Sequence, residues 1–212
     1  MKSTLELVQL PLGPLHTNCY LVADPATRDA VVIDPGWDTS VILEALAERQ
    51  WNARAVLLTH AHFDHLGAVA GVVAATHAPF GIHPLELPLM RQGGGGRTFG
   101  VDVPACPEPD VLLAPSQPLT AGSLRFEVLF VPGHTLGHVA FYHPAAALVL
   151  SGDVLFQQGI GRTDLPGGSY AVLMASIRDV LLALPDETTV CPGHGALTTI
   201  GEERRDNPFL AS

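Results

Sequence analysis

The stretch Thr59-His60-Ala61-His62-Phe63-Asp64-His65 places four side chains that can bind metal within six positions, directly after an apolar run. In an extended segment, side chains two residues apart point to the same side, so His60, His62 and Asp64 share one face. His65 breaks this alternation, and a helix that starts near Asp64 would redirect it. The stretch therefore offers two pairs of ligands, one for each of two neighbouring metal ions.

Three further candidate ligands, His134, Asp153 and His194, each follow an apolar run that is typical of a β-strand. Loops at strand ends are common places for sites on a rigid scaffold, so these segments can meet in one cleft. The Pro-Gly-His turn occurs twice, at 132–134 and 192–194. Imidazoles suit Zn or Fe(II), and the two oxygens of Asp153 can bridge two ions. The predicted metal ligands are His60, His62, Asp64, His65, His134, Asp153 and His194.

Ligand imidazoles need a hydrogen-bond partner on the ring nitrogen that does not bind the metal. Thr59, Asp34 and Thr135 are the candidates for this supporting role. His138 lies four residues after His134, and we interpret it as a supporting residue rather than a ligand.

Composition and charge favour a soluble protein that does not bind nucleic acid. The 212 residues include 21 acidic and 11 basic side chains, and no basic cluster provides the footprint that phosphate binding needs. No apolar stretch is long enough to cross a bilayer, and the first residues lack the features of a signal peptide. The three cysteines are widely spaced, as in reduced cytosolic proteins. We expect a cytoplasmic monomer or small homo-oligomer with one domain over residues 1–212.

Hydrophobic patterning predicts alternating strands and helices. Strands are expected at Leu5–Leu10, Cys19–Ala23, Ala30–Ile33, Ala53–Leu58, Phe80–His83, Leu124–Val131, Val139–His143, Ala147–Leu150 and Thr188–Cys191. Helices are expected at Thr39–Gln50, Leu66–Thr76, Leu85–Arg91 and Ser169–Leu184. The segment Gln92–Pro118, rich in glycine and proline, is either a flexible surface loop or an active-site lid.

The motifs T-H-A-H-F-D-H, G-H-T-L-G-H, S-G-D and P-G-H-G, in this order, resemble those of the metallo-β-lactamase superfamily. The resemblance covers essentially the whole chain. It implies an α/β fold, the αββα sandwich, in which helices flank two mixed β-sheets and the metals lie at one edge. By the same resemblance, the first metal would be bound by His60, His62 and His134. The second would be bound by Asp64, His65 and His194, and Asp153 would bridge the two.

Within the superfamily, Gly159–Gly168 and Thr198–Glu203 resemble the short glyoxalase II-like hydrolases, which are similar to hydroxyacylglutathione hydrolases. The resemblance implies hydrolysis of a small thioester, such as S-lactoylglutathione, by a metal-bound hydroxide, with Asp64 and Asp153 in the catalytic centre. Two divalent metal ions are implied; zinc is the first choice, and iron or manganese is also compatible. The chain departs from full-length glyoxalase II because it stops before the helical region that grips glutathione. The thiol half of the substrate is therefore open.

Arg162 is the predicted contact for a carboxylate of the substrate, because a guanidinium binds a carboxylate with two parallel hydrogen bonds. The alternative for this side chain is an internal ion pair with Asp164.

Two other functions stay open. The first alternative is a persulfide dioxygenase, a group that also resembles this chain strongly and uses one iron, bound by residues that match His60, His134 and Asp153. A non-catalytic metal-binding module is the third reading. Serine or thiol catalysis is disfavoured, because the sequence has neither a G-x-S-x-G nucleophile elbow nor a cysteine beside a histidine.

Overall fold

Two six-stranded β-sheets form the centre of the molecule, which the computed structural model describes over residues 5–115 and 117–210. Residues 1–4, where a signal peptide would begin, lie outside the described part. The first sheet contains, in spatial order, β1 (Glu6–Leu12), β2 (Thr17–Asp24), β3 (Asp29–Ile33), β4 (Asn52–Leu57), β5 (Phe80–Ile82) and β6 (Val111–Leu112). The second contains β14 (Thr198–Thr199), β13 (Thr189–Pro192), β10 (Leu148–Gly152), β9 (Val139–His143), β8 (Leu124–Phe130) and β7 (Pro118–Ala121).

Both sheets are mixed, as the α/β prediction requires. In the first sheet β1, β2 and β3 pair antiparallel, and β3 to β6 pair parallel. In the second sheet β10 and β13 are parallel and the other pairs are antiparallel. A short hairpin of β11 (Leu155–Phe156) and β12 (Gly159–Ile160) follows β10.

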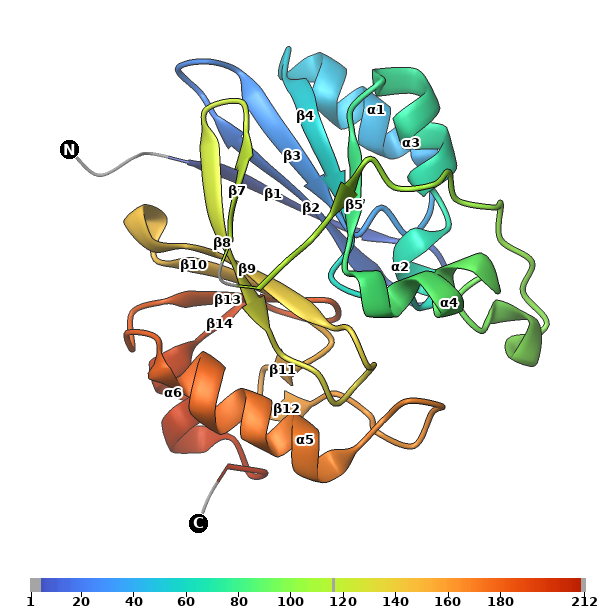
Figure 1. Cartoon of the computed structure of the whole chain (residues 1–212). Helices are drawn as coiled ribbons and strands as arrows, with labels where there is room; N and C mark the ends of the chain where they lie inside the picture. Colours follow the sequence, from blue (N-terminus) through green and yellow to red (C-terminus); the bar gives the residue numbers. More distant parts are fainter. Residues whose placement is uncertain (1–4, 116, 211–212) are drawn as a thin grey trace.

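Helices cover the outer face of each sheet (Figure 1). On the first sheet lie α1 (Thr39–Glu48) and α3 (Val69–Thr76), whose apolar residues share a buried cluster with the outward side chains of β2 to β4. On the second lie α5 (Tyr170–Ala175), its continuation η4 (Ser176–Val180) and η5 (Leu181–Ala183), and α6 (Ile200–Asp206). The remaining short helices are α2 (Phe63–Leu66), η1 (Pro84–Glu86), α4 (Leu87–Arg91), η2 (Gly96–Phe99) and η3 (Pro144–Ala146).

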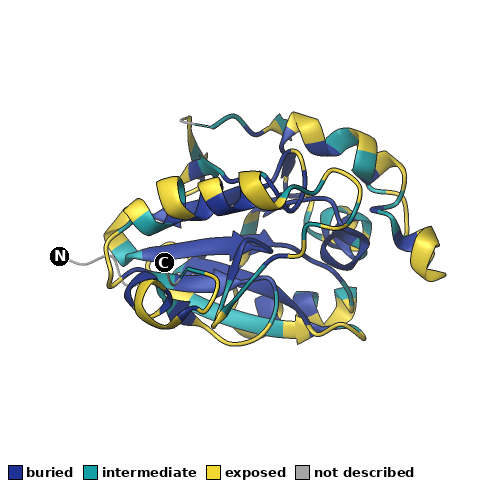
Figure 2. Cartoon of the chain, turned by 90° about the horizontal axis from the view of Figure 1, so that it is seen from below, coloured by how far each residue is buried: buried dark blue, intermediate teal, exposed yellow. Residues whose placement is uncertain are grey.

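Between the sheets lies a third apolar cluster, which contains Tyr20, Ile33 and Leu57 from the first sheet and Phe126 and Phe141 from the second. Strands that are covered on both faces read as nearly continuous apolar runs, which explains the composition of β3 and β10. Figure 2 shows the buried strands between helices that expose their outer sides. The αββα arrangement predicted from the motifs is therefore confirmed.

Strand direction brings the candidate ligands to one edge. Parallel neighbours end at the same edge of a sheet, and β4, β10 and β13 each lead into a segment that contains a predicted ligand. The strand β8 runs in the same direction as β10, because both are antiparallel to β9. Its carboxyl end therefore delivers the fourth segment to the same edge.

The structure corrects several sequence predictions. The expected helix Leu66–Thr76 begins at Val69 as α3, and the separate short helix α2 precedes it, with His62 rather than Asp64 before the first helical residue. The predicted helix Ser169–Leu184 contains a π-helical turn at η4. Sequence reasoning missed β11, β12, β14 and α6, and it treated η2, β6 and the start of β7 as loop. Within the described residues, no helix combines the length and apolar character needed to cross a membrane.

The helix α6 begins with a capping box, from which we predict an effect on stability. The Thr199 hydroxyl accepts the Glu202 amide at 3.2 Å, and the Glu202 carboxylate accepts the Thr199 amide at 3.1 Å. Thr199→Ala should destabilise the fold by about 1 kcal/mol, because the helix loses its N-cap. Thermal unfolding should detect a fall of about 2–4 °C in the Tm. Thr199→Ser keeps the hydroxyl and is the control; an equal fall in both variants would contradict the capping role.

Candidate metal centre

Three histidine nitrogens converge at the edge of the sandwich, and we call His60, His62 and His134 the three-histidine cluster. The first two come from the segment after β4 and the third from the segment after β8. His62 Nδ1 lies 3.1 Å from His60 Nε2 and 2.8 Å from His134 Nε2. All three side chains are buried.

A second group, the Asp–His–His cluster, is formed by Asp64, His65 and His194. The Asp64 Oδ2 atom lies 3.2 Å from His194 Nε2 and 3.6 Å from His65 Nε2. Asp64 and His65 are consecutive residues of α2, and His194 comes from the turn after β13. The His65 ring lies beside that of His60, with the centroids 4.2 Å apart, so the two clusters are neighbours.

Asp153 lies between the two clusters. Its Oδ2 atom is 3.6 Å from His134 Nε2 of the three-histidine cluster and 3.6 Å from His194 Nε2 of the other. Its Oδ1 atom is 3.4 Å from His65 Nε2. One carboxylate thus faces ligand atoms of both clusters, which is the position that a bridging ligand requires.

The donor set fits a pair of divalent cations. Zn–N bonds of about 2.0–2.1 Å in a tetrahedral site place ligand nitrogens about 3.3 Å apart. The spacings of 3.1 and 2.8 Å in the three-histidine cluster are close to that value. In addition, His65 Nε2 and Asp153 Oδ1 are buried and have no hydrogen-bond partner among the described residues. Buried polar atoms of this kind call for a ligand that supplies the missing contact.

Hydrogen bonds fix which nitrogen faces the clusters for four of the five histidine rings. Thr59 Oγ1 donates to Asp34, so it must accept from His60 Nδ1 at 3.0 Å, which leaves His60 Nε2 as the free nitrogen. His65 Nδ1 donates to Asp34 Oδ2 at 3.1 Å. Thr59 and Asp34, two of the three predicted outer partners, are therefore hydrogen-bonded to His60 and His65, and they fix the orientation of these two rings.

Backbone carbonyls orient the rings of His134 and His194. His134 Nδ1 donates to the carbonyl of Arg162 at 2.8 Å, and His194 Nδ1 donates to that of Leu15 at 3.2 Å. Thr135 was predicted as an outer partner, but its hydroxyl is buried and has no hydrogen-bond partner in the described structure. That prediction is wrong, because the chain beyond β8 turns the ring of His134 toward the loop after β12 instead.

Asp34, His60 and His65 form a further group that could hold a metal ion, but the hydrogen bonds of Asp34 favour the supporting role predicted for it. Its carboxylate accepts the Thr59 amide and hydroxyl, each at 2.7 Å, as well as the His65 ring. The backbone of Asp34 has a φ of 52°, which is strained for a residue with a side chain. Three accepted hydrogen bonds hold it in this conformation.

His138 supports the centre, as the sequence suggested. Its Nε2 atom accepts the backbone amide of Asp153 at 3.1 Å. Its ring is nearly parallel to that of His60, with the centroids 4.6 Å apart. His138 therefore positions a predicted ligand without facing the cluster itself.

Electrostatics differ between the two clusters. Burial lowers the pKa of His60 well below its usual value and that of His62 to about 3, and neighbouring histidines add to the effect. These rings are therefore neutral at pH 7, which is the form that binds metal. Burial alone would lower the pKa of His65, but Asp153 and Asp64 outweigh it and raise the pKa well above its usual value.

For the two carboxylates, burial raises the pKa and the neighbouring histidines lower it. Burial alone would raise the pKa of Asp64, but His65 and the hydrogen bond from His194 hold it at about 2. The pKa of Asp153 is lowered as well, because His65 and His134 outweigh the effect of burial. For His194, burial is outweighed by the hydrogen bond to Asp64, and its pKa is raised. The acids are thus anionic at pH 7 and favour cations between them.

Sequence reasoning missed two supporting side chains, Thr17 and Glu86. The Thr17 hydroxyl donates to Asp64 Oδ2 at 2.9 Å from the start of β2. Glu86 is buried and accepts the backbone amides of Ala61 and Gly137. The sequence offered one hint for Glu86. It follows β5, which is parallel to β4 and therefore ends at the same edge of the sheet.

Arg162 is close to the centre through its backbone, but its side chain points elsewhere. The guanidinium donates two hydrogen bonds to Asp164, at 2.8 and 2.7 Å, and both side chains are more than half exposed. The ion pair that was the alternative reading is therefore present. Contact with a substrate carboxylate stays a prediction.

The glycine-rich segment packs against the metal-binding stretch. The Phe63 amide donates to the Gly94 carbonyl at 3.0 Å, and a Cβ atom at Gly94 would lie 2.4 Å from the Phe63 nitrogen. The rings of Phe63 and Phe99 are 5.5 Å apart. Gly94 thus allows a close approach of two backbones beside the candidate ligands.

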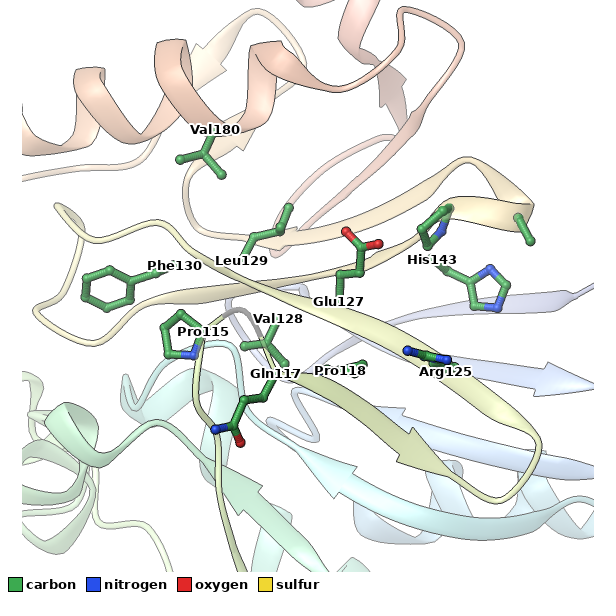
Figure 3. A pocket seen from close by; sticks show the side chains of 12 residues that line it. Pro115, Gln117, Pro118, Arg125, Glu127, Val128, Leu129, Phe130, His143 and Val180 are labelled. Carbon is green, nitrogen blue, oxygen red and sulfur yellow. The ribbon is translucent and has the colours of Figure 1, made fainter.

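A hollow of about 700 Å³ lies away from the two clusters. Figure 3 shows Arg125, Glu127 and His143 around it, on and beside β8. No predicted metal ligand is among the described residues that line it. The chemistry of the two clusters depends on their donor atoms. This hollow contributes none of them.

Comparison with known proteins agrees with this geometry. Residues 12–194 match the family described as "Metallo-beta-lactamase superfamily". A "Probable metallo-hydrolase YqgX" of Bacillus subtilis is 41% identical over 206 residues, 95% of this chain and 96% of that protein. The "Hydroxyacylglutathione hydrolase GloC" of Haemophilus influenzae is 34% identical over 229 residues, 96% of this chain and 97% of that protein.

Solved structures show the same fold. The B3 metallo-beta-lactamase BLEG-1 superposes with a TM-score of 0.94 at 42% identity, over 98% of this chain and 100% of that chain. TTHA1623 in a di-iron-bound form gives 0.88 at 45% identity, with coverages of 96% and 100%. ETHE1 from Myxococcus xanthus gives 0.79 at 32% identity, with coverages of 96% and 83%. Together with the two clusters, the di-iron-bound relative supports divalent metals in this chain.

Proposed function

Because this chain belongs to the metallo-beta-lactamase superfamily, we propose that it is a binuclear metal-dependent hydrolase that cleaves a small thioester of the S-lactoylglutathione type. The observation that carries the proposal is the position of Asp153 Oδ2, at 3.6 Å from a histidine of each cluster. A full-length relationship to GloC supports the thioester.

The seven predicted ligands would hold the two ions, with the three-histidine cluster on one, the Asp–His–His cluster on the other and Asp153 between them. When bound, such metals lower the pKa of a water molecule from about 15.7 toward 7 and thereby provide a nucleophile at neutral pH. Asp34 and the carbonyls of Leu15 and Arg162 keep the ligand rings oriented. Zinc is the proposed metal, and the di-iron-bound relative makes iron the alternative.

The chain's own thiols do not provide another nucleophile. Burial raises the pKa of Cys191 to about 12 and that of Cys106 to about 11. The fully buried Cys19 also has a raised pKa, because burial and the charge of Asp34 disfavour its thiolate. A thiolate is the reactive form of cysteine, so these three side chains are inert at neutral pH.

The test is anaerobic incubation of the purified, metal-loaded protein with S-lactoylglutathione, following loss of the thioester and release of the thiol. We expect turnover without oxygen, its loss after chelation, and its return with added metal. Absence of turnover with fully loaded protein would contradict the proposed substrate. Metal analysis of the same sample identifies the resident ion.

Persulfide dioxygenation is the second candidate, because ETHE1 shares the fold at 32% identity over nearly the whole chain. Oxygen uptake with glutathione persulfide distinguishes it from the hydrolase, which consumes no oxygen. A β-lactam substrate belongs in the same panel, since BLEG-1 is described as a metallo-beta-lactamase. Either activity in place of thioester cleavage would replace the proposal.

Arg162 gives a prediction about substrate binding. If its guanidinium contacts a substrate carboxylate, Arg162→Ala should raise KM severalfold with little change in kcat. Asp164→Asn should lower KM, because it releases the guanidinium from its partner. The carbonyl that orients His134 is unchanged in both variants. Steady-state kinetics on both variants checks this, and an unchanged KM in each would remove Arg162 from the binding role.

A further inference from the structure

Glu86 connects the two segments that supply the three-histidine cluster. Its side chain is only 1% exposed, and it lies at the end of η1, which follows β5. One carboxylate oxygen accepts the Ala61 amide at 2.8 Å, and the other accepts the Gly137 amide at 2.7 Å. Ala61 lies between His60 and His62 in the chain. Gly137 lies in the turn that begins with His134.

The charge of Glu86 has no side-chain counterion in the described structure. None of the ion pairs found among the described residues includes it, and two neutral backbone amides are its hydrogen-bond donors. A buried anion without a cation is costly. Cations bound in the adjacent cluster would lower this cost, so the position of Glu86 is consistent with a metal centre.

The lack of a side chain at Gly137 lets its amide approach this carboxylate. A Cβ atom at position 137 would lie 2.8 Å from His83 Nδ1, 2.9 Å from Leu85 Cβ and 3.0 Å from Glu86 Cγ. Any side chain would therefore push the backbone away from η1. The last glycine of the G-H-T-L-G-H motif thus permits the short hydrogen bond to Glu86.

We propose that Glu86 is a positioning residue that sets the spacing between the two segments of the three-histidine cluster, and thereby the affinity of that cluster for metal. The inference rests on the metal centre proposed above. The two segments follow strands of different sheets, β4 and β8, and one backbone hydrogen bond joins them, from the Val139 amide to the Thr59 carbonyl at 2.9 Å. The Glu86 carboxylate adds a hydrogen bond to each segment closer to the ligands, at Ala61 and Gly137, and it does so without touching the reacting atoms.

Glu86→Gln tests this role with little change of shape. The glutamine has one oxygen for two amide donors, so its NH₂ group must face one of the backbone N–H groups. We expect the affinity for the first metal, measured by chelator competition with Zn²⁺, to fall roughly 10- to 100-fold. The visible spectrum of the Co²⁺-loaded protein should change, because the ligand geometry changes. Glu44→Gln makes the same substitution on the exposed side of α1 and should leave both measurements unchanged.

Wild-type affinity and an unchanged Co²⁺ spectrum in a folded Glu86→Gln protein would overturn the proposal. If Glu86→Gln does not fold, Gly137→Ala is measured in its place, since it moves one of the two amides away from the carboxylate. Unchanged metal affinity in that variant would overturn the proposal equally. These measurements are of metal binding, so a wild-type protein that binds two ions but cleaves no thioester would contradict the proposed substrate alone.

Discussion

Asp64→Ala should bind one metal ion per chain instead of two and should lose about 99% of its thioester hydrolysis or more. The Asp64 Oδ2 atom lies within 3.6 Å of both histidines of the Asp–His–His cluster, so its loss removes the only carboxylate of that cluster. A metal that stabilises charge in the transition state contributes several kcal/mol, and about 2.7 kcal/mol corresponds to 100-fold in rate.

Metal analysis and steady-state kinetics on the same preparation check this prediction. Asp179→Ala is the control, because it removes a carboxylate from the exposed side of η4, far in sequence from the predicted ligands. The variant also separates the two candidate functions. A dioxygenase with one iron on His60, His134 and Asp153 would keep much of its activity without Asp64. Retained thioester cleavage with one ion per chain would contradict the binuclear mechanism.

The sequence predicted which segments carry the candidate ligands, because strand patterns and the residues that follow them are local features. Apolar runs predicted the strands β4, β8, β10 and β13, and the candidate ligands come directly after them. Alternation in the first motif predicted that His60 and His62 share a side, and the structure places their nitrogens 3.1 Å apart. Strand and ligand patterns of this kind need no knowledge of distant contacts.

What could not be predicted depends on contacts between segments far apart in the chain. The rings of His134 and His194 are oriented by carbonyls of Arg162 and Leu15, and a backbone carbonyl has no signature in the sequence. Glu86 is equally invisible, since its partners are backbone amides 25 and 51 residues away. The miss at α6 is different: the pattern Thr199-Ile200-Gly201-Glu202 is a capping box that could have been recognised.

The two Pro-Gly-His turns show that one motif can need its glycine for two reasons. Gly133 has a φ of 126°, and a Cβ atom there would lie 2.2 Å from the Leu173 nitrogen. Its role is therefore conformational and concerns the packing of α5. Gly193 has no such backbone conformation, but a Cβ atom would lie 2.1 Å from Asp153 Oδ1 and 2.7 Å from His65 Cε1. Its role is to leave room for two predicted ligands.

Gly193→Ala should therefore disable the centre without replacing any ligand. The added methyl group must displace Asp153, which lies between the clusters, and His65, which belongs to the second. We expect weaker binding of both ions and a fall in hydrolysis of about 100-fold or more, comparable to the loss of a metal. The metal-free protein should keep its far-ultraviolet circular dichroism, because the backbone at this position accepts a side chain.

Two glycine variants make the test specific to the site. Gly159→Ala places its methyl group in ordinary contact, with the nearest atom at 3.6 Å, and should bind metal like the wild type. Gly133→Ala should instead lower the Tm of the metal-free protein, since its methyl group meets the backbone of α5. Chelator competition and thermal unfolding on the three variants separate these outcomes. If Gly193→Ala bound two ions with wild-type affinity, Asp153 and His65 would not be held where the metal centre needs them, and the bridging role of Asp153 would have to be abandoned.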